Sequence, residues 1–315
     1  MSRVSVGIPV YNEEAGLGEL MRRVRAVLDA IPGGPHEVIL VDDGSSDRTF
    51  ALAEEAAAAD PRIVAVSLSR NFGHQAALSA ALDHSTGDAV VVMDGDLQDP
   101  PEAIPRFLEA HAQGYDVVYA QRTNRKESWH LRAAYWIFYR LMGGLSSIEV
   151  PLDAGDFGLM SRRVVDLLRS VPERNRFLRG LRSWAGFRQL GIPVERDERH
   201  AGSSKYSFRK LLRLAFDGVF AFSTVPIRAA AILGALAIVA AIIFALYSVF
   251  AKVVLHQPTQ GFTALTVLIT FLSGVNLFFL GVIGEYVGRV YEEVKGRPLY
   301  VVSRVVRNGP PALEL

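Results

Sequence analysis

The chain has 315 residues, a formal net charge of +1 and no cysteine, and 50% of its residues are hydrophobic. This length allows about two domains, and the balanced charge argues against a dedicated nucleic-acid binder. Without cysteine, the chain can form no disulfide, no thiolate metal site and no cysteine nucleophile.

Short apolar runs and amphipathic stretches alternate along the first two thirds of the chain. In chain order, the expected strands are "VSVGIPV", "EVILVDD", "RIVAVSL", "DAVVVMD" and "YDVVYAQ". Helical patterns lie between them at Glu14–Ala30, Asp47–Ala59, His74–His84 and Pro101–Gln113. Such alternation is typical of an α/β fold with a mostly parallel sheet between two layers of helices. Ligands of such sheets bind beyond the carboxyl ends of the strands.

Candidate ligand-binding residues follow most of these expected strands. They are Pro9, Tyr11, Asn12 and Glu13 after the first, Asp42, Asp43, Gly44 and Ser45 after the second, Asp94, Gly95 and Asp96 after the fourth, and Gln121 and Arg122 after the fifth. The sequence contains neither a G-x-G-x-x-G turn after the first strand nor a G-x-x-x-x-G-K-[ST] loop, which argues against the usual dinucleotide and P-loop sites. A bound phosphate would therefore need a partner other than a glycine loop.

The run "DGDLQD" at residues 94–99 places three carboxylates directly behind an apolar strand. An ordinary solvated turn would explain aspartate and glycine at this place. The alternative is a cation site, since oxygen ligands suit Mg²⁺ or Mn²⁺ and a pyrophosphate can complete the coordination shell. Asp94 and Asp96 would converge on one ion if the strand geometry continued past Met93, because residues i and i+2 of a strand point the same way.

Histidines are scattered along the chain. His74, His84, His130 and His200 lack the spacing of metal ligands, so we expect them to be ordinary surface or loop residues.

A basic amphipathic pattern begins at Lys205, in the stretch "KYSFRKLLRLAFDGVF". Its apolar residues recur at helical spacing, with basic residues on the other side. We expect a juxtamembrane helix within residues 205–228 that lies along lipid headgroups or packs on the preceding domain.

Two charge-free apolar runs follow, at residues 229–251 and 262–284. Each has 23 residues, enough to cross a hydrocarbon core of about 30 Å at about 1.5 Å per residue. Buried core helices would share this composition, but the short connector "KVVLHQPTQG" favours a membrane hairpin. Small residues that would permit close contacts between spans, and hence a homo-oligomer, are Gly234, Gly274, Gly281 and Gly284.

The charges around the two apolar runs predict their orientation. Basic residues precede the first run and follow the second, whereas the connector has only Lys252. By the positive-inside rule, both termini and the tail at residues 285–315 face the cytoplasm. The opening "MSRVSVGIPVYNEE" lacks the pattern of a signal peptide, so we expect a cytoplasmic catalytic domain over residues 1–204.

Six motifs follow one another along the chain: "IPVYNEE", "VDDGSSD", "NFGHQAAL", "MDGDLQDPPE", "GDFGLMSR" and "AGSSKYSFRK". In this order, and followed by two apolar runs, they resemble the polyprenyl-phosphate glycosyltransferases. That family includes dolichyl-phosphate mannose synthases and bacterial undecaprenyl-phosphate glucosyltransferases. The resemblance implies a nucleotide-diphosphosugar transferase fold of the GT-A type and an inverting transfer of one sugar to a polyprenyl phosphate.

The resemblance also implies roles for individual residues. The base and ribose of the nucleotide would lie against Pro9, Tyr11, Glu13, Asp42 and Asp43, and the metal and diphosphate among Asp94, Asp96 and Gln98. Arg122 would sit near the phosphates, and Asp156 would be the acidic residue close to the acceptor. The acceptor phosphate would be held by Arg199, Ser204 and Lys205, although "GSSKY" also suits a flexible linker.

The implied reaction is attack by a lipid phosphate oxygen on the anomeric carbon, while the nucleoside diphosphate leaves from the opposite face. A phosphate monoester has a second pKa of about 6, so the acceptor is largely dianionic at neutral pH. We therefore expect Asp156 to orient the acceptor as much as to remove a proton. Mg²⁺ or Mn²⁺ held by the D-x-D motif would stabilise the leaving group, and the basic residues would offset the repulsion between two phosphates.

The motif "DLQDPPE" and the two apolar runs resemble the bacterial branch of the family. UDP-glucose or a related UDP-sugar is thus the first expected donor and GDP-mannose the second, with a cell-envelope glycan made at the bacterial plasma membrane. A processive polysaccharide synthase would usually need more spans and a Q-x-x-R-W motif, which "RGLRSW" does not match. A catalytically silent membrane scaffold and a nucleotidyltransferase on a similar sheet would each explain only part of these motifs.

Overall fold

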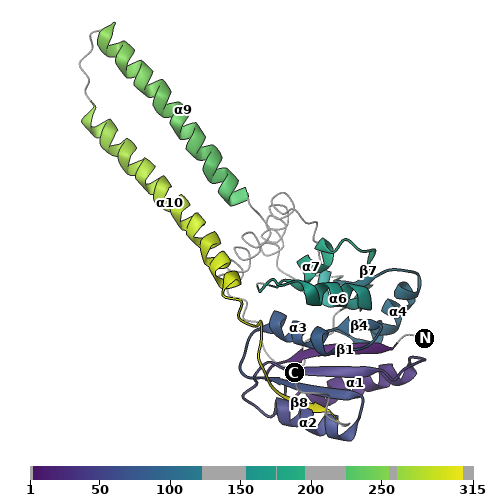
Figure 1. Cartoon of the computed structure of the whole chain (residues 1–315). Helices are drawn as coiled ribbons and strands as arrows, with labels where there is room; N and C mark the ends of the chain where they lie inside the picture. Colours follow the sequence, from purple (N-terminus) through teal and green to yellow (C-terminus); the bar gives the residue numbers. More distant parts are fainter. Residues whose placement is uncertain (1–2, 123–153, 175, 196–224, 255–260, 308–315) are drawn as a thin grey trace. The chain divides into compact units, whose positions relative to one another are not determined.

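The structure is a computed structural model that describes residues 3–122, 154–174, 176–195, 225–254 and 261–307 (Figure 1). The chain divides into two units. The first holds the described residues up to 195 together with 297–307, and the second holds the described residues from 225 to 296.

The first unit is built on one eight-stranded sheet, in the order β7-β5-β6-β4-β1-β2-β3-β8. The strands are β1 (Val4–Val10), β2 (Glu37–Asp42), β3 (Ile63–Leu68), β4 (Ala89–Val92), β5 (Val117–Arg122), β6 (Ala154–Ser161), β7 (Gln189–Val194) and β8 (Val302–Arg307). β4, β1, β2 and β3 pair in parallel, as do β5 and β7, whereas β6 and β8 run antiparallel to their neighbours. The prediction of a mostly parallel α/β sheet is confirmed.

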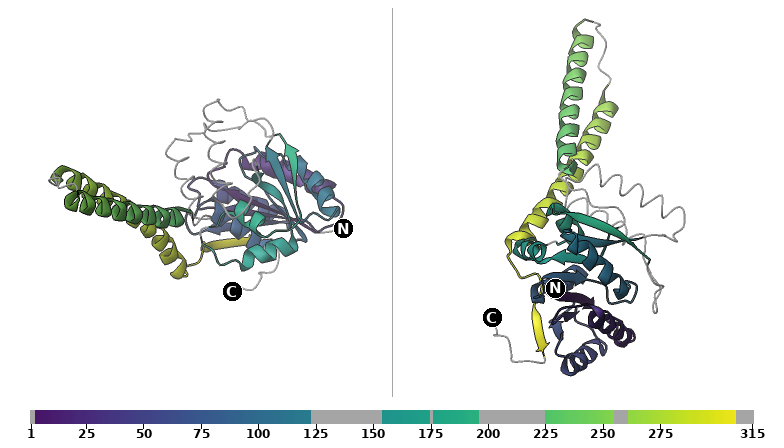
Figure 2. Two further views of the ribbon diagram at one scale, coloured as in Figure 1. Left: turned by 90° about the horizontal axis from the view of Figure 1, so that it is seen from above. Right: turned by 90° about the vertical axis from the view of Figure 1, so that its right-hand side faces the viewer.

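Helices cover both faces of this sheet, as Figure 1 and Figure 2 show. On one face lie α1 (Leu17–Ala30), α2 (Thr49–Ala59), the short helix η1 (Pro101–Ala103) and α4 (Ile104–Ala112). On the other lie α3 (His74–His84), α6 (Arg162–Ser170) and α7 (Leu178–Trp184). β1 and β2 are buried at every position, which is why their sequences are continuously apolar rather than alternating.

Helix α3 packs closely against the sheet. Its residues 76–82 are all buried, and most of them are alanine, so the helix lies close to the sheet. The helix connects β3 to the parallel strand β4 and therefore begins at the carboxyl ends of these strands and finishes at their amino ends. Its first residue, His74, is thereby placed at the edge where ligands are expected.

Strand β8 was not predicted, because residues 285–315 read only as a tail. It pairs antiparallel with β3 at the edge of the sheet. Just before it, the backbone oxygen of Val301 accepts a hydrogen bond from the Ser69 amide (2.9 Å). The Tyr300 hydroxyl donates to Asp83 Oδ2 on α3 (2.7 Å). The segment after the second apolar helix is therefore part of the first unit.

Buried polar contacts secure the opposite, amino-terminal end of the strands. The Glu37 carboxylate, at the start of β2, is only 5% exposed. It accepts hydrogen bonds from Ser5 Oγ (2.6 Å), the Thr86 amide (2.5 Å) and Arg3 Nη2 (2.9 Å). These bonds join β1, β2 and the loop between α3 and β4.

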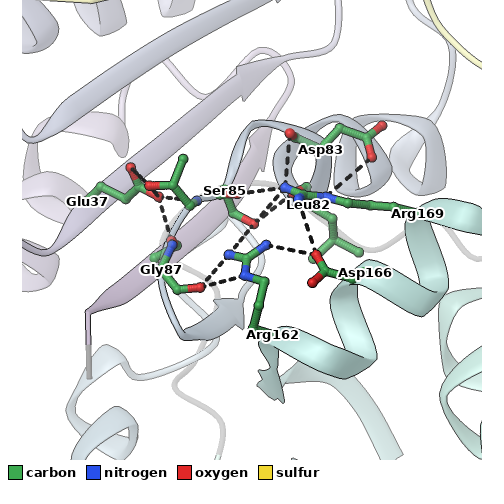
Figure 3. A network of polar contacts seen from close by, with 10 residues as sticks. Glu37, Leu82, Asp83, Ser85, Gly87, Arg162, Asp166 and Arg169 are labelled. Carbon is green, nitrogen blue, oxygen red and sulfur yellow. Dashed lines mark hydrogen bonds and ion pairs between the residues drawn. The ribbon is translucent and has the colours of Figure 1, made fainter. Parts of the chain in front are cut away.

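Two arginines of α6 hold the same loop from the other side, as Figure 3 shows. Arg162 donates to the Gly87 carbonyl (2.8 Å from Nε). Arg169 donates to the carbonyls of Asp83 (3.0 Å) and Ser85 (2.6 Å). The end of α3 is therefore fixed by α6 as well as by the segment before β8.

Replacing Glu37 with glutamine is expected to lower the free energy of unfolding by about 2–4 kcal/mol, since a glutamine cannot accept from all of these donors. Burial opposes ionisation of Glu37, but the bonds from Ser5 and Thr86 outweigh it and hold its pKa below the ordinary value. The stabilisation is thus complete at neutral pH and is lost as the pH falls below about 4.3. Chemical unfolding of the full chain in detergent would measure this difference, and it should shrink in acid. Glu109→Gln, at an exposed position of α4, is the control, and a neutral-pH loss no larger than in this control would contradict the prediction.

The second unit contains two long helices, α9 (Val225–Val253) and α10 (Phe262–Val294). Within them, Ala230–Ala251 and Val267–Val294 have mean hydropathies of 2.6 and 2.2 and are long enough to cross a membrane. Their apolar side chains are exposed rather than packed in a core, which fits the predicted transmembrane hairpin. α10 continues ten residues beyond the predicted run, and most of the expected juxtamembrane helix, residues 205–224, lies outside the described residues.

Candidate active site

The carboxyl ends of three strands lie side by side in the sheet. β1 pairs with β2 on one side and with β4 on the other. The Asp43 amide donates to the Val10 carbonyl (3.0 Å), and the Met93 amide donates to the Gly7 carbonyl (3.1 Å). The residues that follow β1, β2 and β4 therefore meet at one edge, as the rule for open α/β sheets predicts.

The acidic loop at residues 94–99 does not continue the strand. The condition under which Asp94 and Asp96 would point the same way is therefore not met. β4 ends at Val92 and residues 93–99 belong to no strand, so strand alternation does not align Asp94 and Asp96. Later in the loop, Leu97 has a left-handed backbone with φ of 62°. A Cβ atom on Gly95 would lie 2.8 Å from Val10 Cγ1 and 2.9 Å from the Pro9 carbonyl. Glycine is needed here because the loop lies directly against the end of β1.

Four ionisable side chains meet at this edge of the sheet. Asp156, on β6, accepts two hydrogen bonds from Arg179 on α7, both of 2.7 Å. His74 Nε2 lies 3.6 Å from Asp156 Oδ2 and 3.4 Å from Asp94 Oδ1. The Asp156 side chain is 7% exposed and that of Asp94 is 25% exposed, whereas that of His74 is 45% exposed. The structure thus brings together two predicted residues and two that were not predicted.

The surroundings shift the protonation equilibria of these groups. Burial and the charge of Asp99 raise the pKa of Asp94 to about 6. Burial opposes ionisation of Asp156, but the Arg179 guanidinium outweighs it and holds the Asp156 pKa far below its usual range. For His74, burial opposes protonation, but the carboxylates of Asp156 and Asp94 outweigh it and raise the imidazole pKa.

Arg182 is hydrogen-bonded to the backbone next to the Asp156 carboxylate. It is 3% exposed and donates hydrogen bonds to the backbone carbonyls of Gly155 (2.8 Å) and Asp156 (3.3 Å). Burial lowers the pKa of Arg182 to about 10, so the side chain is still charged at neutral pH. Arg182 therefore fixes the backbone of β6 at the residue whose carboxylate Arg179 holds.

The residues predicted to bind the nucleotide differ in their solvent exposure. Tyr11 is 47% exposed and Glu13 is partly exposed, whereas Pro9 is buried within β1. Asp42 Oδ1 accepts a hydrogen bond from the Ser45 amide (3.2 Å). The exposed ring of Tyr11 is therefore the most accessible surface in this group.

The Asp43 carboxylate is hydrogen-bonded to the protein backbone. Its two oxygens accept hydrogen bonds from the backbone amides of Phe72 (2.7 Å) and Gly73 (2.9 Å). Gly73 has φ of 98°, a left-handed conformation, and directly precedes α3. Asp43 thus anchors the start of the helix that carries His74.

The structure does not describe the side chains of four of the predicted site residues. Arg122 is the last residue of β5, and its side chain lies outside the described part of the structure. Arg199, Ser204 and Lys205, predicted to hold the acceptor phosphate, also lie outside the described residues.

The residues of the acidic loop fit a divalent cation that shares its coordination shell with a diphosphate. Asp94, Asp96 and Gln98 offer hard oxygen donors within five residues. The described part of the chain contains no group of three or more His, Asp or Glu side chains arranged as a complete metal site. One or two carboxylates completed by substrate phosphates is the usual arrangement for Mg²⁺.

Sequence reasoning missed three residues of this site. His74 was expected to be an ordinary surface or loop residue, and Arg179 and Arg182 were considered only as a failed Q-x-x-R-W match. Neither their spacing nor their composition marks them, because they reach Asp156 only through the packing of α3 and α7 against the sheet. The available signals for His74 were its place in the family motif "NFGHQAAL" and at the start of an expected helix.

Comparisons with known proteins agree with this architecture. Residues 5–168 match Glycosyl transferase family 2. The uncharacterized glycosyltransferase YkcC of Bacillus subtilis is 42% identical over 95% of this chain and 93% of its own length. The bactoprenol glucosyl transferase of Shigella phage SfII is 39% identical over 98% of this chain and 100% of its own length.

A further relative acts, by its name, on another sugar. The undecaprenyl-phosphate 4-deoxy-4-formamido-L-arabinose transferase of Edwardsiella ictaluri is 40% identical over 98% of this chain and 95% of its own length. The resemblance noted from the motifs is confirmed by these relatives. Because residues 5–168 match this family and these relatives, about 40% identical, cover nearly the whole chain, the chain belongs to glycosyltransferase family 2.

Proposed function

We propose that this glycosyltransferase transfers one sugar from a nucleotide diphosphosugar to undecaprenyl phosphate or a similar polyprenyl phosphate. The observation that carries this proposal is the similarity, over nearly the whole chain, to relatives named for bactoprenol and undecaprenyl phosphate. That similarity extends through the region of the two apolar helices. A chain with two helices suited to a membrane is also suited to a lipid acceptor.

The donor would bind at the carboxyl ends of β1, β2 and β4. The exposed ring of Tyr11 offers a surface for the nucleotide base. Glu13 lies in the loop after β1, and Asp42 is the last residue of β2. UDP-glucose is the first proposed donor because one relative is named a glucosyl transferase. GDP-mannose is the second.

The acidic loop would carry the diphosphate end of the donor. Asp94, Asp96 and Gln98 would hold Mg²⁺ or Mn²⁺, which when bound supplies Lewis-acid stabilisation of the charge on the leaving diphosphate. The raised pKa of Asp94 supports this role, since crowded carboxylates gain from a nearby cation. Arg122 would add positive charge near the phosphates.

Asp156 would face the acceptor. Because Arg179 keeps Asp156 ionised and occupies both of its oxygens, this carboxylate is a weak base. The acceptor phosphate is already largely dianionic at neutral pH and needs no strong base. Asp156 would therefore orient the acceptor for attack on the anomeric carbon from the face opposite the leaving group, with inversion. Arg199, Ser204 and Lys205 would hold the acceptor phosphate.

The proposed location is a bacterial plasma membrane, with residues 1–204 and both termini on the cytoplasmic side. The juxtamembrane region at 205–228 would connect the catalytic domain to spans at 229–251 and 262–284. The charge distribution around the spans supports this orientation. The strand β8 adds residues 302–307 of the tail at 285–315 to the catalytic sheet.

Mass spectrometry of the lipid fraction tests the proposal. The purified full chain is incubated with undecaprenyl phosphate, Mn²⁺ and either UDP-glucose or GDP-mannose, with a chelator control. A chelator-sensitive mass increase of one hexose is the expected result, larger with UDP-glucose. No glycolipid from a full panel of nucleotide sugars, with nucleotide still bound, would refute transfer and favour the silent scaffold.

A further inference from the structure

Among the described residues of the active site, His74 has contacts that no assigned role explains. It stands at the start of α3, while Asp94 follows β4 and Asp156 lies on β6. Its Nε2 atom is 3.4 Å from Asp94 Oδ1 and 3.6 Å from Asp156 Oδ2. One imidazole nitrogen is therefore within reach of both the carboxylate assigned to the donor side and the carboxylate assigned to the acceptor side.

We propose that His74 is a positioning residue that holds Asp94 and Asp156 in the relative arrangement that sugar transfer requires. The inference rests on the proposed function, because it assumes that the donor diphosphate lies at Asp94 and the acceptor at Asp156. Two reactants must meet in a defined geometry for the displacement, and small errors in that geometry are costly. A donor group between the two carboxylates couples the positions of the two half-sites.

The fold provides a rigid base for this histidine. The two residues before it, Phe72 and Gly73, donate their amides to the buried carboxylate of Asp43 at 2.7 and 2.9 Å. The residues after it, 76–82, are buried against the sheet. An imidazole has only two side-chain torsions, so once the backbone is fixed its nitrogen has a narrow range of positions. A lysine or arginine at the same place would be far less restricted.

The other contacts of Asp156 do not duplicate this role. Arg179 donates to both oxygens of Asp156 from α7, and Arg182 holds the β6 backbone. Both arginines thus fix Asp156 to its own side of the site. His74 adds a contact in the direction of Asp94, and its side chain is 45% exposed, so it is accessible from solvent.

Two substitutions separate positioning from folding. His74→Ala removes the contact, and His74→Gln keeps an amide N–H close to the place of Nε2. We expect kcat for sugar transfer to fall about 100-fold in His74→Ala, with the KM for the nucleotide sugar changed by less than about threefold. His74→Gln should recover at least about one tenth of the wild-type kcat, since it can still donate to one carboxylate.

Added imidazole provides a second measurement. Because the side chain is partly exposed, the space left in His74→Ala is open to solvent, and imidazole in the buffer should raise its kcat. It should leave the wild type unchanged. The matched control is His84→Gln, at the last residue of the same helix, which should keep wild-type kcat and show no response to imidazole. Thermal unfolding of every variant should stay close to that of the wild type.

Two results would overturn the inference. A wild-type kcat in His74→Ala would show that the contact is dispensable. An equal loss in His74→Ala and His74→Gln, with a lowered unfolding temperature and no response to imidazole, would show that His74 serves folding alone. A wild type that transfers no sugar to undecaprenyl phosphate would refute the proposed function instead, and the same variants would then be compared by their slow hydrolysis of the nucleotide sugar.

Discussion

Asp156→Asn is expected to lower the rate of sugar transfer by at least about 100-fold. Asp156 accepts two hydrogen bonds of 2.7 Å from Arg179, and an asparagine can accept only one of them. The substitution turns an amide N–H₂ toward a guanidinium and removes the negative charge that His74 also contacts. Loss of a single preorganised polar group in an active site typically costs about 10²–10³ in kcat. Initial rates of the full chain with saturating donor and acceptor would measure the effect.

Asp166→Asn is the control for this substitution. Asp166 is an exposed carboxylate on α6 that lies 3.6 Å from Arg162 and 3.5 Å from Arg169. Exposed pairs of this kind contribute little to stability, so the variant should transfer sugar at the wild-type rate. A rate for Asp156→Asn within about threefold of this control would contradict the role given to Asp156.

Asp96→Asn is expected to remove most transfer and, with it, the stimulation by Mg²⁺ or Mn²⁺. Asp96 Oδ1 accepts a hydrogen bond from the Gln98 amide (3.1 Å), which an asparagine oxygen can also accept. The substitution therefore keeps this hydrogen bond of the acidic loop and removes the negative charge that a cation would use. We expect a loss of at least about 100-fold in rate with an unchanged unfolding temperature.

A metal titration separates this effect from general damage. The wild type should lose activity with a chelator and regain it with Mn²⁺, whereas Asp96→Asn should respond to neither. Glu109→Gln, at an exposed position of α4, should behave as the wild type. Near-normal, metal-stimulated transfer by Asp96→Asn would remove Asp96 from the metal site.

Local sequence patterns predicted the strands β1 to β5 and the helices between them, but not the parallel strand β7. α3 spans His74–His84 as predicted, since an apolar helical pattern is bounded there by turn residues. α2 begins at Thr49 rather than at Asp47, because Asp47 Oδ1 accepts a bond from the Thr49 amide (3.0 Å) and closes the preceding turn. The exact first residue of a helix thus depends on a single side chain, and the spacing of apolar residues does not predict it.

Those patterns did not predict the antiparallel strands. β6 has the sequence "AGDFGLMS", whose glycines and aspartate are poor strand signals. It forms because β4 and β5 pair with it on both sides. The site divides in the same way: a strand end indicated Asp94 and the family motif indicated Asp156, while His74 and Arg179 reach them through helix packing that no local spacing encodes.

The position of β8 has a consequence for how the protein is made. β3 ends at Leu68, and its outer edge is covered only when residues 302–307 arrive. At about 5–20 residues per second, a ribosome needs roughly 10–50 s to synthesise the intervening chain, which includes α9 and α10. During that time the β3 edge is an open template for pairing with other chains. The sheet can therefore be complete only after both apolar helices have left the ribosome.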